Sequence, residues 1–361
     1  MRLGLLLCCA ALAGCPTGAE PGPDPTPAPF DAELADALQT VLHQSAFAID
    51  APGATATVHV PGEGTWAGAT GFAHLDPGRP TEPDDRYRIG SITKPFNAAV
   101  VLQLVDEGAL NLADPVTTWL PWLTGAEEIT VEDLLRHSSG IVSYTDTALF
   151  VDALDEPWDP RDIVEHCWDL GPLFTPGAEY AYSNTNYYAL ALLVEAVTGA
   201  PWHTAIRQRL LDPLGLADTW VEGHEDDARG FVTPYLQGID VTGRLDPSWH
   251  WASGGMIGTG ADLVAWVDAL VSGEVLPEAL TAAMRTPWTL PSGDLAPYGY
   301  GWRIDATAAC GAIEGHTGST MGFQSDLVRR EDGVVIAVLV NDFLSEASDI
   351  TEALCAALNA R

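Results

Sequence analysis

The chain has 361 residues, of which 47% are hydrophobic and 18% charged, so it can bury a large core in about two domains, or in one domain with an inserted lobe. Its 50 acidic residues outnumber its 16 basic residues and give a formal net charge of −34 at pH 7. This balance excludes nucleic acid as a partner, because binding the phosphate backbone requires clustered lysine and arginine.

The first residues have the layout of an export signal followed by a tether. Arg2 precedes an apolar run that is too short to cross a bilayer as a mature helix, and small residues follow it. The ending LAGC resembles the bacterial lipobox, so we expect a signal peptide over 1–14 and a lipid on Cys15. Residues 15–30 are rich in proline and predict an extended tether to the folded domain. The alternative is a cleaved signal ahead of a disordered terminus.

The remaining residues, 31–361, carry the periodic patterns of a folded domain. Apolar residues at helical spacing predict a helix from Asp31 to about Phe47, with Asp31 as its N-cap, and 54–74 predicts two strands joined by a turn. The middle of the chain is mostly helical in pattern. Strand patterns and a last amphipathic helix then follow, at 298–304, 318–330, 334–340 and 347–360.

Strands and helices at both ends around a helical middle predict an α/β (α+β) fold. One sheet is built from both termini, and an all-α lobe is inserted into it. We expect the sheet lobe over about 31–90 and 290–361, and the helical lobe over about 91–289.

The segment YRIGSITKPF, residues 87–96, holds the only lysine of the chain, whereas every other basic residue except histidine is arginine. Pro95 suits the first turn of a helix, so Ser91 and Lys94 lie at i and i+3 near a helix N-terminus. A serine hydroxyl needs a base to become a good nucleophile. Lysine can be that base because burial lowers its pKa, whereas a guanidinium stays protonated. The plain alternative is a capping serine followed by a solvated lysine.

Two later segments carry polar residues that match this chemistry. YAYSNTNYYAL contains Tyr182-Ser183-Asn184, and EGHTGSTMGF places His316-Thr317-Gly318 at the start of a strand pattern. In order and spacing, the three segments resemble the serine β-lactamases, the penicillin-binding proteins and related esterases, in which S-x-x-K is followed by Y-x-N or S-D-N and then by K-T-G. The segments LLRHSSG, PLGLADTW and WASGGMIGTGADL extend the resemblance over nearly the whole folded part. Within this superfamily the chain looks most like secreted serine D-alanyl-D-alanine carboxypeptidases and class C β-lactamases.

The resemblance implies a β-lactamase/transpeptidase-like fold, with an antiparallel sheet flanked by helices, and a role for each matching residue. Ser91 would be the acylated nucleophile and Lys94 its proton partner. Tyr182 would act as a base or proton relay, and Asn184 would orient Lys94 and bind a substrate amide. The backbone N–H groups of Ser91 and Ser319 would form the oxyanion hole. The sequence leaves open whether Lys94 or Tyr182 takes the first proton.

His316 departs from the lysine that β-lactamases usually carry at this position, whereas the carboxypeptidases carry histidine. An unperturbed histidine is mostly neutral above about pH 6.5, so a substrate carboxylate needs another cation. Arg303 matches the arginine that meets the terminal carboxylate in the carboxypeptidase, and a planar guanidinium suits a carboxylate. The resemblance completes the substrate pocket with Thr145, Trp251, Thr317 and Gly318.

Once Cys8 and Cys9 leave with the signal and Cys15 carries a lipid, three cysteines remain, which in an exported chain allow one disulfide and a spare thiol. The carboxypeptidase joins positions similar to Cys310 and Cys355, so the resemblance implies that pair here and leaves Cys167 free and buried. The sequence shows neither the H-E-x-x-H nor the C-x-x-C pattern of metal sites. A phosphate-binding P-loop needs a lysine after its glycine, and the sole lysine is already placed next to Ser91. We therefore expect no metal and no cofactor.

The first functional hypothesis is an acyl-enzyme serine hydrolase that removes the terminal D-alanine of peptidoglycan stem peptides and is acylated by penicillin. The second is an esterase or class C-like β-lactamase on the same scaffold. The third is a non-catalytic lipoprotein that binds peptidoglycan or β-lactams. We expect an exported monomer, in the periplasm or at the cell surface of a bacterium, that touches the membrane only through its lipid.

Overall fold

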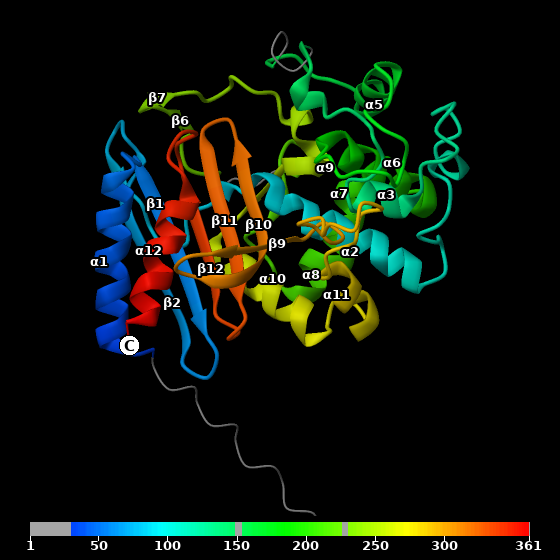
Figure 1. Cartoon of the computed structure of the whole chain (residues 1–361). Coiled ribbons are helices and arrows are strands. Elements are labelled where there is room, and N and C mark those ends of the chain that lie inside the picture. The colour runs from blue at the N-terminus through cyan, green and yellow to red at the C-terminus, as the bar shows by residue number, and fades with distance from the viewer. Residues whose placement is uncertain (1–29, 149–153, 226–229, 361) are drawn as a thin grey trace, which may run out of the picture.

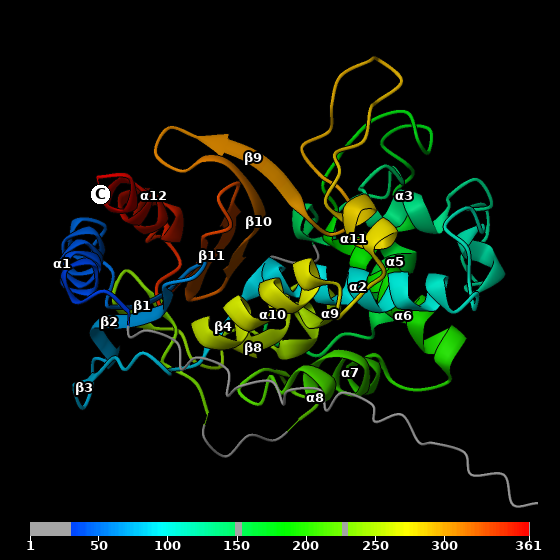
Figure 2. The same cartoon turned by 90° about the horizontal axis from the view of Figure 1, so that it is seen from below.

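The computed structural model describes residues 30–148, 154–225 and 230–360. The signal peptide, Cys15 and all but the last residue of the tether lie outside the described residues. Figure 1 shows a sheet with helices on both sides, and Figure 2 shows the same arrangement from below.

The main sheet has seven strands in the order β3-β2-β1-β12-β11-β10-β9, and all its pairs are antiparallel. β1 pairs with β12 in the centre of the sheet, in a register that places Ala56 opposite Val338. The first and last long strands are therefore neighbours, and the prediction of one sheet built from both termini is confirmed. The strands are β1 (Gly53–Val60), β2 (Gly64–His74), β3 (Arg79–Pro80), β9 (Arg303–Thr307), β10 (Gly311–Thr320), β11 (Phe323–Arg330) and β12 (Val335–Val340).

Both faces of the sheet are covered, which explains why β12 is apolar at every position and fully buried. One face packs against α1 (Ala32–Ala48) and α12 (Ala347–Asn359), which lie side by side. Leu38 and Leu354 are buried in the core that these helices share with the sheet. Asp31 caps α1 as predicted, and its carboxylate accepts a hydrogen bond from the Leu34 N–H at 2.8 Å.

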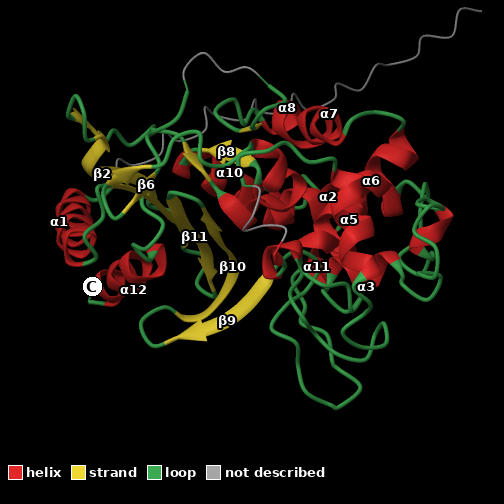
Figure 3. Ribbon diagram, turned by 90° about the horizontal axis from the view of Figure 1, so that it is seen from above, coloured by secondary structure: helices red, strands yellow, loops and turns green. Residues whose placement is uncertain are grey.

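The other face packs against α10 (Gly260–Ser272), which belongs to the inserted helical segment of about 91–289. The rest of this segment lies beyond α10 (Figure 3). α2 (Thr93–Asp106) runs through the core of this segment, where Phe96 stacks on Trp266 at 4.1 Å between ring centroids. The other helices are α3 (Val131–Leu135), α5 (Pro160–Asp169), α6 (Asn184–Thr198), α7 (Trp202–Ile206), α8 (Asp212–Leu214), α9 (Trp251–Gly254) and α11 (Glu278–Met284).

Short strands also occur within and next to the inserted segment. A three-stranded sheet has the order β4-β8-β5, and β6 pairs with β7. Their bounds are β4 (Tyr87–Arg88), β5 (Trp220–Val221), β6 (Tyr235–Leu236), β7 (Ile239–Asp240) and β8 (Met256–Gly258). Within the described residues, no single helix is long and apolar enough to cross a membrane. The bent pair Asn184–Thr198 and Trp202–Leu214 meets the criteria on length and composition only.

Two strand predictions are corrected by the structure. The strand predicted from Tyr298 begins only at Arg303, because a turn precedes it in which the Gly299 N–H donates to the Trp302 carbonyl. The motif at 316–318 lies toward the end of β10 and not at the start of a strand, because β10 already pairs with β9 from Gly311 onward.

Cys310 and Cys355 form a disulfide that ties β10 to α12, and Cys167 is a buried free thiol. The bond closes a loop of 45 residues that contains β11 and β12. It therefore restricts the unfolded chain around the centre of the sheet.

We predict that replacing both cysteines with alanine lowers the free energy of unfolding by about 2–5 kcal/mol, because the unfolded chain regains its loop entropy. Urea denaturation of the native protein and the double variant measures the difference. Ser91 lies outside this loop, and Ser319 lies near the opposite end of β10 from Cys310, so fluorescent penicillin should label both folded proteins at the same rate. Equal midpoints for the two proteins would contradict the prediction.

Candidate active site

Ser91 lies in a tight turn that leads directly into α2. The turn spans Gly90–Ile92, and α2 begins at Thr93, so Ser91 and Lys94 share one face near the helix N-terminus. The Ser91 hydroxyl lies 2.9 Å from Lys94 Nζ and 3.0 Å from the Tyr182 hydroxyl. The structure thus brings Tyr182, which is 91 residues away in sequence, to the neighbouring pair Ser91 and Lys94.

Lys94 is fully buried, and its Nζ has three hydrogen-bond acceptors within reach. Besides Ser91 Oγ, they are Asn184 Oδ1 and the Ser253 carbonyl, both at 2.7 Å. Burial lowers the pKa of Lys94 well below its usual range. A neutral amine has two N–H donors and one lone pair. It can therefore donate to Asn184 and Ser253 and accept the Ser91 proton.

Tyr182 has the opposite tendency. Its side chain is half-buried in the pocket wall, and this burial raises its pKa above the usual range even though it is hydrogen-bonded to Ser91. Lys94 Nζ lies 4.9 Å from the centre of the Tyr182 ring. Tyr182 therefore holds its proton where Lys94 loses one, so Lys94 is the better base and Tyr182 the better donor.

Asn184 and Thr145 form a support behind the lysine. Asn184 begins α6 and donates from Nδ2 to Thr145 Oγ1 at 3.2 Å, while its backbone N–H donates to Ser143 Oγ at 3.1 Å. Both ends of the Asn184 amide are thus occupied. The two side chains bond each other, and Asn184 Oδ1 accepts from Lys94, while their contacts with a substrate stay a prediction.

His316 is buried on β10 and is uncharged. Its Nδ1 lies 2.6 Å from the Thr317 carbonyl, which can only accept, so this nitrogen carries the proton. Nε2 then accepts from the Tyr298 hydroxyl at 2.8 Å. Burial and the nearby Lys94 lower the pKa of His316 to about 3. The His316 imidazole therefore stays neutral at pH values well below 6.5.

Glycines bring the Ser91 turn against the end of β10. Gly90 has φ 52°, and a Cβ there would come within 2.7 Å of the Ser319 backbone nitrogen. A Cβ at Gly318 would overlap the Ile89 carbonyl, so close packing against the Ser91 turn requires glycine here. Ser91 and Ser319 consequently line the same pocket, as a two-donor oxyanion hole requires.

The pocket above Ser91 has a volume of about 500 Å³ and holds Arg303 at its mouth. Arg303 Nη2 lies 2.9 Å from Asp305 Oδ2, two residues along the same strand. Roughly a third of the Arg303 side chain is exposed, and about half of that of Asp305. Thr317, Tyr180 and Tyr182 also line this pocket. The charged groups at the mouth are thus one cation and one anion.

Comparison with known proteins agrees with this geometry. The family model described as Beta-lactamase matches residues 18–360, which is nearly the entire chain. The chain belongs to the beta-lactamase family. It is a serine hydrolase of this family, which unites β-lactamases with penicillin-binding proteins and related hydrolases.

Relatives within the beta-lactamase family are named for different activities. The chain is 31% identical over 346 residues to Penicillin-binding protein 4 of Amycolatopsis lactamdurans (87% of this chain, 86% of the relative). It is 29% identical over 341 residues to Esterase EstB of Burkholderia gladioli (82% and 86%). A D-stereospecific amidohydrolase from Streptomyces sp. superposes with a TM-score of 0.77 at 33% identity (88% of this chain, 98% of that structure). The chain spans 62% of Penicillin-binding protein 4* of Bacillus subtilis, to which it is 25% identical over 296 residues, or 73% of this chain.

The short helix α9 of this beta-lactamase family member holds two residues that bear on the site. Trp251 is buried and packs against Tyr188 and Trp202 at 5.4 and 5.7 Å between ring centroids, and its contact with a substrate stays a prediction. Ser253, which the sequence analysis did not identify, contributes its backbone carbonyl, which accepts from Lys94. A backbone carbonyl leaves no trace in residue type, so sequence reasoning could not find it.

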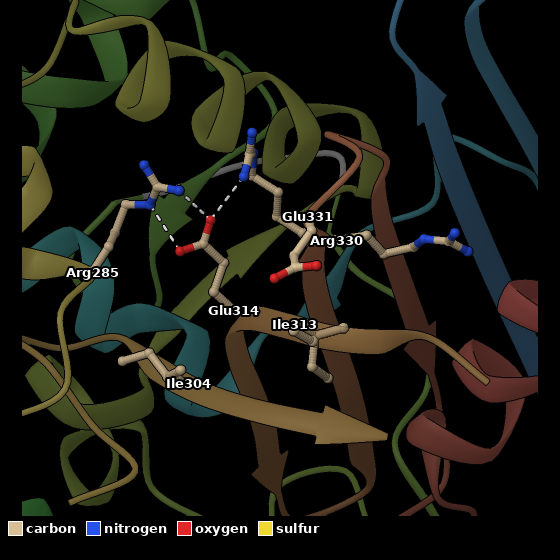
Figure 4. Close-up of a pocket in the computed structure, with 8 residues that line it drawn as sticks. Arg285, Ile304, Ile313, Glu314, Arg330 and Glu331 are labelled. Atoms are coloured by element: carbon tan, nitrogen blue, oxygen red, sulfur yellow. Dashed lines mark hydrogen bonds and ion pairs between the residues drawn. The ribbon is translucent and has the colours of Figure 1, made fainter. Parts of the chain in front are cut away.

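A second hollow of about 460 Å³ lies on the outside of β9 and β10 (Figure 4). There, Glu314 accepts hydrogen bonds from Arg285 and Arg329, at 2.8 and 2.9 Å. Three of its charged groups thus bond one another, and the nucleophile lies elsewhere, so we assign the active site to the Ser91 pocket. No group of three or more potential metal ligands occurs within the described residues.

We predict that Lys94→Arg lowers the rate of Ser91 acylation by about 10²- to 10⁴-fold, because a guanidinium cannot give up its proton. Stopped-flow labelling with fluorescent penicillin measures the rate, and circular dichroism checks folding. Arg161→Lys, an exposed change of the same type in α5, serves as the matched control. Native-like labelling of Lys94→Arg would refute the role of the lone lysine.

The pH dependence of acylation should show one ascending limb, because the rate falls as Lys94 gains its proton. Since the pKa of Lys94 is lowered, the limb lies at lower pH than the usual value of 10.5 for lysine. His316 stays neutral down to about pH 3 and adds no limb near pH 6.5. Labelling rates from pH 4 to 10 test this. A limb near 6.5 that disappears in His316→Asn would contradict it.

Proposed function

We propose that the protein cleaves peptides ending in D-alanyl-D-alanine, as found in peptidoglycan, and releases the terminal D-alanine through an acyl-enzyme on Ser91. The observation that carries this proposal is the position of Arg303, whose guanidinium lines the pocket that contains Ser91. A guanidinium binds a carboxylate through two parallel hydrogen bonds. A peptide held by its terminal carboxylate would present its last amide bond to the nucleophile.

In the proposed mechanism, neutral Lys94 takes the Ser91 proton as Oγ attacks the peptide carbonyl. The oxyanion forms against the backbone N–H groups of Ser91 and Ser319. The amide C–N bond then breaks, and the leaving nitrogen takes the proton of the Tyr182 hydroxyl, which is 3.0 Å from Ser91 Oγ. The proton that Lys94 took from Ser91 then restores the Tyr182 phenol. Water hydrolyses the acyl-enzyme by the reverse proton path, and penicillin acylates the same oxygen.

A specific observation favours a second candidate, hydrolysis of esters or amides without a free carboxylate. Asp305 already bonds Arg303, so a substrate carboxylate must share the guanidinium with Asp305 or displace it. The esterase and the amidohydrolase among the relatives are consistent with such substrates. β-Lactam hydrolysis is less favoured, because His316 provides no positive charge where β-lactamases usually carry lysine.

The experiment compares release of D-alanine from a peptide ending in D-Ala-D-Ala with hydrolysis of p-nitrophenyl acetate and labelling by fluorescent penicillin. Ser91→Ala should abolish all three, and Ser272→Ala, on the distant helix α10, should abolish none. Ester cleavage without D-alanine release would favour the second candidate. Binding without any turnover would favour a non-catalytic protein.

The location of the protein is a separate proposal, which rests on the N-terminal sequence alone. We propose that it is exported and held at the membrane by a lipid on Cys15, with a monomeric catalytic domain beyond the tether. Expression of the full chain in bacteria with radioactive palmitate should label the native protein and not Cys15→Ser. Equal labelling of both would refute the anchor.

We predict that Asp305→Asn raises kcat/KM about two- to fivefold for the carboxylate-ended peptide, because the exposed ion pair no longer competes for Arg303. The same peptide ending in D-alaninamide should be unaffected. Arg303→Gln should reverse the preference and lose activity only on the carboxylate. Equal effects of Asp305→Asn on the two peptides would show that this pair does not select substrates.

A further inference from the structure

The helix α3 ends in a histidine where most helices place glycine. His137 follows the C-cap Arg136 and has φ 61°, a left-handed conformation that is uncommon for residues with a side chain. The Ser138 N–H donates to the Asp133 carbonyl at 2.8 Å, and the His137 N–H to the Leu134 carbonyl at 3.5 Å. These are the two bonds of a Schellman motif, in which glycine is the usual residue at this position. A histidine here indicates that its side chain has a use.

The histidine holds the chain on both sides of Tyr182. Its Nδ1 accepts from the Ser183 N–H at 3.1 Å, and its backbone carbonyl accepts from the Ala181 N–H at 3.0 Å. The residues before and after the tyrosine are thus bonded to the same residue. Glycine at 137 would keep the second bond and lose the first.

The ring also packs directly against the tyrosine. The ring centroids of His137 and Tyr182 are 4.3 Å apart, and Tyr298 lies on another side at 4.7 Å. The imidazole is fully buried, and its Nε2 has no hydrogen-bond partner among the described residues. Because Nδ1 accepts, the ring is neutral with its proton on Nε2. Burial, with Lys94 and His316 nearby, lowers the pKa of His137 well below its usual range and preserves this state.

We propose that His137 is a positioning residue that fixes the Tyr182 hydroxyl at Ser91 by bonding the backbone on both sides of the tyrosine. The inference rests on the proposed function, in which Tyr182 passes a proton to the leaving group. His137 itself touches neither Ser91 nor the substrate in this scheme. Its contribution is the alignment of the phenol at the junction between a loop and α6.

The test uses two substitutions that tolerate the left-handed backbone. His137→Asn places an amide oxygen near the position of Nδ1 and can still accept from Ser183, whereas His137→Gly has no acceptor. Each is made in the native protein and in Tyr182→Phe. Leu38→Ala, in the core shared by α1 and the sheet, controls for a general loss of stability. Stopped-flow labelling with fluorescent penicillin gives the limiting acylation rate and the half-saturating concentration, and thermal melting gives stability.

We expect His137→Gly to lower the limiting rate about 10- to 100-fold, with little change in half-saturation, because a misplaced proton donor slows chemistry and not binding. His137→Asn should recover most of the rate. In Tyr182→Phe the glycine substitution should cost nothing further, because the group that it misplaces is gone.

Three outcomes would overturn the inference. Equal losses in His137→Asn and His137→Gly would show that the acceptor is unimportant. An undiminished loss in the Tyr182→Phe background would show that His137 acts through another group, with the proposed function intact. Native-like acylation by Tyr182→Phe alone would refute the proton relay of the proposed function and this inference together.

Discussion

The enclosure of Lys94 is the constraint on which the active site depends. Removing an ammonium from water costs several kcal/mol, so a buried lysine shifts toward its neutral form unless a partner carboxylate compensates. Here its three partners are a hydroxyl, an amide oxygen and a backbone carbonyl. None of them carries a charge, and the amine is therefore held as a base next to a serine. Its partners come from the Ser91 turn, α6 and α9, so the base exists only where these elements meet.

The groups around Lys94 are kept uncharged by the same environment. His316 and His137 are buried and lose their protons readily, and Tyr182 retains its own. A second positive charge in this enclosed space would repel a protonated lysine and would attract anions to the wrong point. The charged side chains of the pocket are Arg303 and Asp305, which pair with each other at its mouth. In a chain with a net charge of −34, this one arginine marks the end of the pocket that can receive a carboxylate.

This separation of a neutral centre from a charged mouth explains how one family serves several reactions. Acyl transfer to serine needs the base, the donor and the backbone N–H groups, and these do not depend on what leaves. The choice among peptide, amide and ester rests on a few side chains at the entrance. Penicillin-binding proteins, an esterase and an amidohydrolase are accordingly all similar to this chain.

The sequence by itself determined the residue types that the chemistry requires. The lone lysine three residues after Ser91, the Tyr182-Ser183-Asn184 segment and the 316–318 motif identified the family, and the periodic patterns placed the sheet between both termini. Local patterns could do this because nucleophile and base are neighbours on one helical turn. Along a strand, the residue types likewise follow which faces are buried. Only the tertiary structure decided what each side chain contacts. In the folded protein Trp251 packs in the core and Thr145 bonds Asn184. Arg303 pairs with Asp305, and the Ser253 carbonyl accepts from Lys94. These contacts use backbone atoms or join residues that are far apart in the chain, so residue type alone does not reveal them. The burial that lowers the pKa of Lys94 likewise exists only once the whole domain has packed.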